Sequence, residues 1–261
     1  MPQINHFEWF IVTIILLSII GYLIGGILFA PIFGKFLSKN IRKEGSMNPG
    51  ATNLIRTTKN RYIGIVATIC DAFKSYFIIL ISWLIVKYVF IGEYWKDSNL
   101  TLGALIFLPG VFVIIGHCFP LKYIIYFIKF KGDKEKIKDF SGGKGVSSFG
   151  GLVSAISPWL MLIGLAMFFV LLLIFRYVSL SSLLSTLILS CLVWIKQLDL
   201  IYFKVWESNE ALFANGWYFI GLLFLFMLLA TSFIWYRHRL NIIRLFKKTE
   251  PKAFTKKENQ I

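Results

Sequence analysis

Long apolar runs separated by polar segments dominate this chain of 261 residues. The apolar stretches lie near residues 7–30, 62–90, 100–116, 147–175, 180–196 and 215–236. About 20 consecutive apolar residues match the hydrocarbon thickness of a bilayer, so the longer runs are predicted to be membrane-spanning helices. The pattern therefore predicts an all-α integral membrane protein.

The stretch 147–175 contains a proline at position 158. Proline lacks the N–H group that a continuing helix would use, so one helix is expected to end at Ser157 and another to begin at Pro158. This split gives a short helix over 147–157 and a longer one over 158–175. The chain is then predicted to have about seven transmembrane helices.

Basic residues are unevenly distributed among the polar segments. Segments 35–61, 122–144 and 237–261 contain 22 of the 28 Lys and Arg residues, whereas 91–99 and 196–214 together contain three. Cytoplasmic segments of membrane proteins carry the excess of Lys and Arg, so the N-terminus is predicted to lie outside and the C-terminus in the cytoplasm. An even number of spans must then separate the second and third basic segments, which again favours the split at Pro158.

The formal net charge is +15. One explanation is adhesion to anionic lipid, which contributes about 1 kcal/mol for each basic residue near the surface. The three cysteines, Cys70, Cys118 and Cys191, are scattered and mostly within apolar segments. They predict neither a disulfide framework nor a metal site.

The first basic loop contains the turn-rich segment EGSMNPGATNLIR, residues 44–56. Small hydrogen-bonding residues alternate there with Gly and Pro, so the segment can fold back and present hydroxyl, amide and backbone N–H groups together. The planar guanidinium of its arginine is suited to phosphate. The alternative is an ordinary interhelical turn, although a long and polar one. The candidate site residues of this loop are Ser46, Asn48, Gly50, Thr52, Asn53 and Arg56.

The second basic loop closes with FSGGKGV, residues 140–146. Glycines around a lysine allow several backbone N–H groups to turn toward one point, which is how anions are often held. Positions 138 and 145 carry Lys and Gly, so the nucleotide P-loop pattern is not met. The alternative is a flexible connector beside a helix end. The candidate phosphate-binding residues here are Gly142, Gly143, Lys144, Gly145 and Val146.

The third basic segment begins with RHRLNIIRL, residues 237–245. On a helix His238 and Asn241 are three residues apart, and Arg237, Asn241 and Arg244 lie on overlapping faces, so these side chains can address one point. The alternative is a belt of basic residues at the membrane surface.

Three further polar residues lie within apolar segments. His117, in GHCFP, is placed at the end of a membrane helix, where a single histidine is more often structural than catalytic. Asp71 and Lys74 are three residues apart on one helix and can neutralise each other. Ionisable residues are costly in a membrane, so this pair is expected to support a structure or a site.

The segments GSMNPGATNLIR, GHCFP…GGKGV and HRLNIIRL occur in that order. They resemble the three signature motifs of the bacterial acyl-phosphate-dependent glycerol-3-phosphate acyltransferases, and CDAFK resembles the Asp-x-x-Lys of that family. The resemblance implies a single membrane domain over residues 1–261, multi-pass in the bacterial plasma membrane, with its active site on the cytoplasmic face. It implies transfer of an acyl group from acyl phosphate to the 1-hydroxyl of sn-glycerol 3-phosphate, the first step of phospholipid synthesis.

The same resemblance implies roles for the candidate residues. Substrate or phosphate binding is implied for the other residues of the two loops and for His117 and Arg244, and site support for Asp71 and Lys74. No cofactor or metal is expected. The expected partners are acyl phosphate, glycerol 3-phosphate and membrane lipid but no nucleic acid, and the enzyme that forms the acyl phosphate is a candidate partner. Catalytic roles are implied for Ser46, Arg56, Lys144, His238 and Asn241.

Two questions stay open at this point. The proton of the attacking hydroxyl can go to His238 or to a phosphate oxygen of a substrate. The chain also departs from the family in a basic insertion at about 121–141, for which altered regulation and a lipid-contacting hairpin are both candidate roles.

The glycine-lysine loop is assigned to the acyl phosphate, and a basic tail occupies about 246–261.

The alternative from another functional class is a transporter or flippase for an anionic phosphorylated solute or lipid. Such proteins carry an internal repeat with broken helices at matching positions, and no repeat is evident in this sequence. A metal-dependent membrane phosphotransferase would need clustered aspartates, whereas Asp71 is the only acidic residue deep within an apolar segment.

Overall fold

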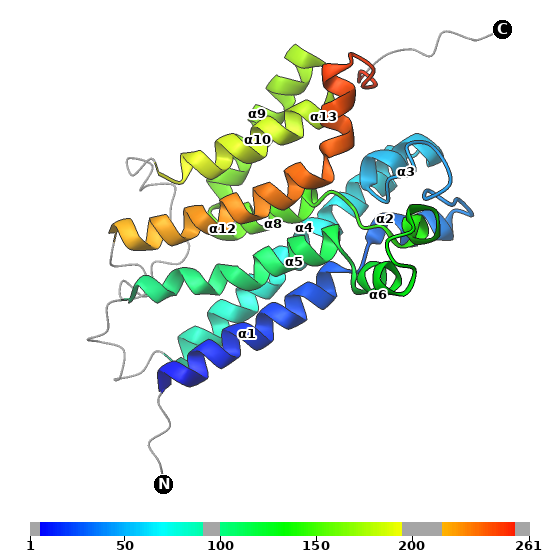
Figure 1. Ribbon diagram of the computed structural model, residues 1–261. Coiled ribbons are helices and arrows are strands. Elements are labelled where there is room, and N and C mark those ends of the chain that lie inside the picture. The colour runs from blue at the N-terminus through cyan, green and yellow to red at the C-terminus, as the bar shows by residue number, and fades with distance from the viewer. Residues whose placement is uncertain (1–5, 91–99, 195–215, 254–261) are drawn as a thin grey trace, which may run out of the picture.

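The computed structural model describes residues 6–90, 100–194 and 216–253, and every regular element within these residues is helical. The predicted polar segments 91–99 and 196–214 and the end of the tail, residues 254–261, lie outside them. A bundle forms the body of the protein (Figure 1). Its helices are α1 (His6–Gly25), α4 (Arg61–Ile85), α5 (Leu108–Cys118), α8 (Val146–Ile156), α9 (Pro158–Phe175), α10 (Val178–Leu192) and α12 (Gly216–Arg237).

The helices follow a simple spatial order. Across the bundle α1, α5, α12, α10 and α9 pack in succession, and α4 and α8 pack against each other and against α5. A π-helical turn, Val86–Phe90, extends α4, and a 3-10 segment, Leu100–Phe107, leads into α5. Helix α5 is therefore the central element of the bundle.

The membrane-spanning potential is concentrated in four helical stretches, Glu8–Phe36, Arg61–Phe90, Pro158–Phe175 and Tyr218–Arg237. A fifth candidate combines Ala104–Cys118 with Leu121–Lys129, which are bent by 48° relative to each other. The apolar helix α8 has 11 residues, and at about 1.5 Å per residue it covers roughly half the hydrocarbon thickness. The all-helical architecture was predicted correctly, whereas seven spans and an outside N-terminus remain predictions.

The helix break predicted at Pro158 is present. Helix α8 ends at Ile156, Ser157 is extended, with φ −161° and ψ 124°, and Pro158 begins α9. The Ser157 hydroxyl oxygen accepts a hydrogen bond from the Leu160 N–H at 3.3 Å and so caps the new helix. Proline is tolerated at this position because the first N–H groups of a helix have no partner within it.

Glycines allow the helices to approach closely. A Cβ atom added at Gly116 of α5 would lie 2.0 Å from the Tyr22 carbonyl oxygen of α1. One added at Gly151 of α8 would lie 1.9 Å from the Ala72 carbonyl oxygen of α4. Small residues at such positions let membrane helices gain van der Waals contact where lipid provides no hydrophobic driving force.

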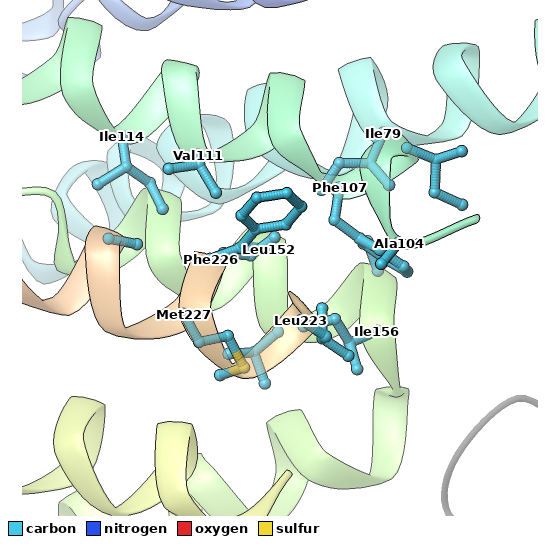
Figure 2. Packing of buried hydrophobic residues seen from close by; sticks show 14 of the residues in the cluster. Ile79, Ala104, Phe107, Val111, Ile114, Leu152, Ile156, Leu223, Phe226 and Met227 are labelled. Carbon is cyan, nitrogen blue, oxygen red and sulfur yellow. The ribbon is translucent and has the colours of Figure 1, made fainter. Parts of the chain in front are cut away.

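The interior of the bundle is a continuous apolar cluster around α5 (Figure 2). Val111 and Ile114 of α5 are fully buried in it, together with Ile79 of α4, Leu152 of α8 and Met227 of α12. In contrast, α9 is apolar throughout, and only 17% of its apolar window is buried. An apolar surface of this kind is expected for a helix that contacts lipid.

Short helices gather at the end of the bundle where α1, α5 and α12 terminate (Figure 1). They are α2 (Phe29–Phe36), α3 (Ala51–Thr58), α6 (Leu121–Lys129) and α13 (Arg239–Phe246). Helix α6 is followed by α7 (Lys134–Ile137) and a 3-10 turn, Lys138–Phe140, so most of the predicted insertion 121–141 is helical. All three basic segments meet here, and this end is called the basic end.

Gly151→Ala should destabilise the fold, because the added methyl group would meet backbone that cannot move aside. Overpacking costs about 1 to 3 kcal/mol, and each kcal/mol lowers the melting temperature by about 2 to 4 °C at this size. Thermal unfolding of the detergent-solubilised protein measures the effect. Gly221→Ala in α12 is the control, since its nearest neighbour, a Trp194 ring atom, would be 3.9 Å away. Equal melting temperatures would contradict the packing argument.

Candidate active site

A cavity of about 1340 Å³ opens at the basic end, and its lining comes from the three motif segments and from α9 and α10. Three of the predicted residues, Lys74, Gly142 and Gly143, are not part of its lining. The predicted residues that line it are Ser46, Asn48, Gly50, Thr52, Asn53, Arg56, Asp71, His117, Lys144, Gly145, Val146, His238, Asn241 and Arg244.

Asn53 organises the first loop. Its side-chain oxygen accepts a hydrogen bond from the Ser46 N–H at 2.8 Å, and its amide group donates to the carbonyl oxygens of Ile41 and Glu44 at 2.7 and 3.0 Å. Asn53 is 1% exposed. Because the side-chain oxygen and nitrogen of Asn53 are both hydrogen-bonded to backbone groups of the loop, Asn53 stabilises the conformation of the loop around Ser46.

Helix α3 presents the exposed part of the same segment to the cavity. Thr52 and Arg56 are one turn apart, and both side chains are exposed and line the cavity. Gly50 caps the helix in an extended conformation, where a Cβ atom would lie 2.9 Å from the Asn48 side-chain nitrogen. The loop therefore delivers one guanidinium and one hydroxyl group to the same wall.

The glycines of the second loop press against the end of α5. The Gly143 N–H donates to the His117 carbonyl oxygen at 2.9 Å, and a Cβ atom at Gly143 would lie 2.1 Å from His117 Nε2. The Arg237 guanidinium donates to the carbonyl oxygens of Gly142 and Gly143. The first two glycines thus hold the loop in place. The sequence alone had suggested that they face the ligand.

The residues that follow them face the cavity. Gly145 adopts φ +85° at the start of α8, and Lys144, Val146 and Ser147 line the cavity beside it. The first N–H groups of a helix have no partner within the helix, and the helix dipole favours an anion at this end. Lys144 and the N-terminus of α8 together can hold a phosphate group.

The charge around Lys144 is concentrated. Burial, together with the nearby Arg244, Arg237 and Arg56, lowers the pKa of Lys144 to about 8 against the opposite effect of Glu250. Lys144 is therefore desolvated and also lies close enough to three guanidinium groups to feel their charge, although Arg56 and Arg244 are themselves exposed. An anion placed among them would relieve their mutual repulsion, so the site is electrostatically suited to a multiply charged oxyanion.

His238 lies at the junction of α12 and α13 and is 2% exposed. Burial, assisted by Lys144, lowers its pKa to about 4. The ring is therefore neutral at pH 7. Nδ1 is 2.8 Å from the Ile234 carbonyl oxygen, which can only accept, so Nδ1 carries the proton and Nε2 keeps its lone pair. His238 can accept a hydrogen bond from a ligand hydroxyl.

Glu250 joins the third motif to α10. Its carboxylate accepts hydrogen bonds from Ser179 Oγ and Asn241 Nδ2, both at 2.7 Å, and from Arg244 Nε at 2.8 Å. Burial alone would raise the pKa of Glu250, but these three donors outweigh it and hold the pKa below its ordinary value. No site role was predicted from the sequence for Glu250 or Ser179. The repeated serines of α10, in an otherwise apolar helix, are the sequence feature that could have indicated a polar surface there.

Asp71 and Lys74 form the ion pair that the sequence predicted, with Nζ and Oδ1 2.9 Å apart. Lys74 also donates to the carbonyl oxygens of Gly25 and Ile27 at 3.0 and 2.9 Å, and its Nζ lies 3.0 Å from His117 Nδ1. His117 is 3% exposed. These contacts hold α1, α4 and α5 together beside the cavity, and Asp71 and His117 also line it.

The cavity has two chemically different parts. The polar part contains the basic and amide groups described above. The other part lies along α9, where its lining includes Met161, Leu165 and Phe168. Helix α10 adds Leu189 and the hydroxyl groups of Ser179, Ser182, Ser185 and Thr186. Within the described residues no group of three or more His, Cys, Asp or Glu side chains could hold a metal ion. The cavity can accommodate a ligand with an anionic head and an apolar tail.

Known proteins share this sequence pattern and fold. The sequence model of the family described as "Glycerol-3-phosphate acyltransferase" matches residues 15–248. The glycerol-3-phosphate acyltransferase of Malacoplasma penetrans (strain HF-2) is 38% identical over 264 residues, which covers 94% of this chain and 96% of the relative. That of Mycoplasma pneumoniae (strain ATCC 29342 / M129 / Subtype 1) is also 38% identical and covers 90% and 92%.

Two crystal structures resemble the fold. Both are of PlsY (YgiH), described as an integral membrane glycerol 3-phosphate acyltransferase, one in a glycerol 3-phosphate form and one in a lysophosphatidic acid form. Their TM-scores are 0.62 and 0.63, and each is 28% identical in sequence. Each alignment covers 92% of this chain and 95% of the other.

Binding of inorganic phosphate should weaken above about pH 8, because Lys144 is cationic below its pKa of about 8 and neutral above it. A bound dianion favours the charged lysine, so the Kd should rise about tenfold per pH unit above that value. Calorimetric titration of the solubilised protein with phosphate between pH 7 and about 10 measures this. Lys144→Arg should remove the slope, since a guanidinium stays protonated throughout. Parallel profiles for the two proteins would show that Lys144 does not hold the anion.

Proposed function

The chain belongs to the glycerol-3-phosphate acyltransferase family, and we propose that it transfers an acyl group from acyl phosphate to the 1-hydroxyl of sn-glycerol 3-phosphate. The products are 1-acyl-sn-glycerol 3-phosphate, which is lysophosphatidate, and inorganic phosphate. The reaction begins phospholipid synthesis.

The two-part cavity is the observation that carries this proposal. Both substrates bear a phosphate group, and one also bears a hydrocarbon chain. Lys144, Arg56 and Arg244 supply positive charge at the polar part, while the cavity-facing side of α9 supplies an apolar wall. A site for a small soluble anion alone would not need the apolar part.

The phosphate groups of the two substrates are assigned to different parts of the cavity by the positions of the basic side chains. The phosphate of the acyl donor lies at Lys144 and the N-terminus of α8, so that its chain extends toward Met161 and Leu165. Glycerol 3-phosphate lies against the first loop, with its phosphate at Arg56 and its hydroxyl directed to His238 Nε2. Ser46 and Asn241 also line the cavity.

The chemistry needs alignment and charge stabilisation. The 1-hydroxyl oxygen attacks the acyl carbonyl carbon, the bond from that carbon to the phosphate oxygen breaks, and phosphate leaves with the electron pair. Acyl phosphate is already activated, so phosphate departs without a strong acid. Preorganised cations stabilise the charge that develops, and holding both substrates in one cavity removes the entropic cost of their encounter.

A phosphate oxygen of a substrate takes the hydroxyl proton in this mechanism. A general base works best when its pKa is near the operating pH. The second pKa of a phosphate monoester is about 6, whereas that of His238 is about 4 in the empty site. His238 then acts as the hydrogen-bond acceptor that orients the hydroxyl.

The basic end is assigned to the cytoplasmic side of the bacterial plasma membrane. Three basic segments gather there, and short cytoplasmic segments of membrane proteins carry the excess of Lys and Arg. Glycerol 3-phosphate is a cytoplasmic metabolite in this assignment, and acyl phosphate reaches the apolar wall from the bilayer.

The donor assay tests the proposed reaction. Purified protein is given labelled glycerol 3-phosphate together with palmitoyl phosphate, palmitoyl-CoA or palmitoyl acyl carrier protein, without added divalent metal. We expect lysophosphatidate and free phosphate with palmitoyl phosphate, because the cavity offers phosphate-binding groups and an apolar wall. Product analysis by chromatography separates the three donors.

Equal or faster turnover with palmitoyl-CoA would overturn the donor assignment. No product with any donor, together with uptake of glycerol 3-phosphate into sealed vesicles, would favour the transporter alternative. Run in sealed inverted vesicles, in which the cytoplasmic face is outward, the same assay should use externally added glycerol 3-phosphate.

His238→Ala should lower kcat/KM about tenfold to a hundredfold, the effect of losing one orienting hydrogen bond. The acidic limb of its pH–rate profile should stay at about pH 6, where the substrate phosphate titrates. Lys247→Ala, at the exposed end of α13, is the control and should leave the rate unchanged. A wild-type limb near the His238 pKa of about 4 that disappears in His238→Ala would place the base on His238.

A further inference from the structure

Helix α6 carries an aliphatic face that points away from the protein. Leu121, Ile124, Ile125 and Ile128 recur at the spacing of one helix face. Their side chains are 46%, 38%, 51% and 71% exposed. No residue of α6 is buried. Four adjoining aliphatic side chains in such a position would be unfavourable in water.

The opposite face of α6 packs on the protein through aromatic rings. Tyr126 stacks on Phe140 with 3.8 Å between ring centroids and 4° between planes, and Tyr123 contacts Phe119. Lys122 and Lys129 both lie along one edge between the two faces, seven residues apart, and are exposed. The helix therefore has an inner aromatic face, an outer aliphatic face and a basic edge.

The segment leaves the bundle and returns to the same place. Helix α6 follows α5 after a bend of 48°, and Lys131 and Gly132, with φ of 48° and 79°, reverse the chain at its other end. The chain comes back beside His117, whose carbonyl oxygen accepts from Gly143. A segment that begins and ends beside the end of α5 does not cross the membrane.

We propose that α6 lies in the bilayer surface at the basic end and binds anionic lipid headgroups. Its aliphatic face enters the boundary between headgroups and acyl chains, and Lys122 and Lys129 contact the headgroups. An interfacial helix has this combination of an apolar face and a basic edge. The insertion 121–141 has six lysines and three acidic residues, which matches an anionic surface, and α6 continues directly from a membrane helix.

The same contacts connect the lipid surface to the candidate active site. Phe140, on which Tyr126 stacks, directly precedes Ser141, whose carbonyl oxygen accepts a hydrogen bond from Arg42 Nη1 at 2.6 Å. Gly142, Gly143 and Lys144 follow without a break. The position of α6 on the bilayer therefore influences the position of the loop that carries Lys144. Tyr126 is a positioning residue for that loop.

Spin labels test the location of α6 without using activity. Cys70 and Cys191 are replaced by alanine in the full chain, buried Cys118 is kept, and single labelled cysteines are placed at Ile128 or at exposed Glu135. In vesicles containing phosphatidylglycerol, the Ile128 label should collide more with oxygen than with a water-soluble nickel complex, and the Glu135 label the reverse. Greater access of nickel to Ile128, or spin–spin broadening from a second copy, would overturn the proposal.

Acyl transfer in vesicles tests whether the basic edge of α6 binds anionic lipid and whether this binding affects the active site. Activity should rise with the fraction of phosphatidylglycerol in phosphatidylcholine. Lys122→Gln with Lys129→Gln should shift the half-maximal fraction upward, since each lysine contributes about fivefold to anionic lipid affinity. The control pair Lys247→Gln with Lys248→Gln, exposed at the same end, should not shift it.

Tyr126 separates lipid binding from its transmission to the loop. Tyr126→Ala should keep the Ile128 label at its depth but remove the response of activity to phosphatidylglycerol, and Tyr126→Phe, which retains the ring, should restore the response. These activity measurements rest on the proposed function, whereas the label depth does not, so failure of one is distinguishable from failure of the other. An unchanged lipid response in both Lys122→Gln with Lys129→Gln and Tyr126→Ala would overturn the proposal.

Discussion

The approach of the glycine-lysine loop to the end of α5 is the contact on which the candidate site depends. The Gly143 N–H donates to the His117 carbonyl oxygen, and Arg237 donates to the carbonyl oxygens of Gly142 and Gly143. Any side chain at Gly143 would displace the His117 ring. Because the loop is held on both sides in this way, Lys144 faces the cavity at the start of α8.

A buried charge network supports that contact from below. An ammonium group taken out of water is costly unless it is paired and hydrogen-bonded. Lys74 meets this demand with Asp71 and with the carbonyl oxygens of Gly25 and Ile27 at the end of α1, and it lies beside His117. The need to satisfy one buried cation therefore fixes where α1 and α5 end relative to the middle of α4, and the cavity lies beside those ends.

Much of this arrangement could be predicted from local sequence features. Long apolar runs indicate membrane helices because their length must match the bilayer, and Pro158 breaks the fourth run because it lacks the N–H group that a continuing helix would use. The polar residues inside those runs, Asp71 and Lys74, were expected to pair because a charge in such surroundings needs a partner. The three motif segments, which include Lys144 and His238, were expected to share one site, and they do line one cavity.

The sequence by itself thus determined the helical class, the break at Pro158 and the residue types gathered at the basic end. Only the tertiary structure decided what each residue does there. The side chain of Asn53 forms its hydrogen bonds within its own loop, and Glu250 accepts a hydrogen bond from Ser179 on a different helix. The low pKa of His238 also follows from burial beside Lys144, which is distant in the chain. Helix length and proline geometry act between near neighbours, whereas desolvation and hydrogen-bond partners depend on which distant segments the packing brings together.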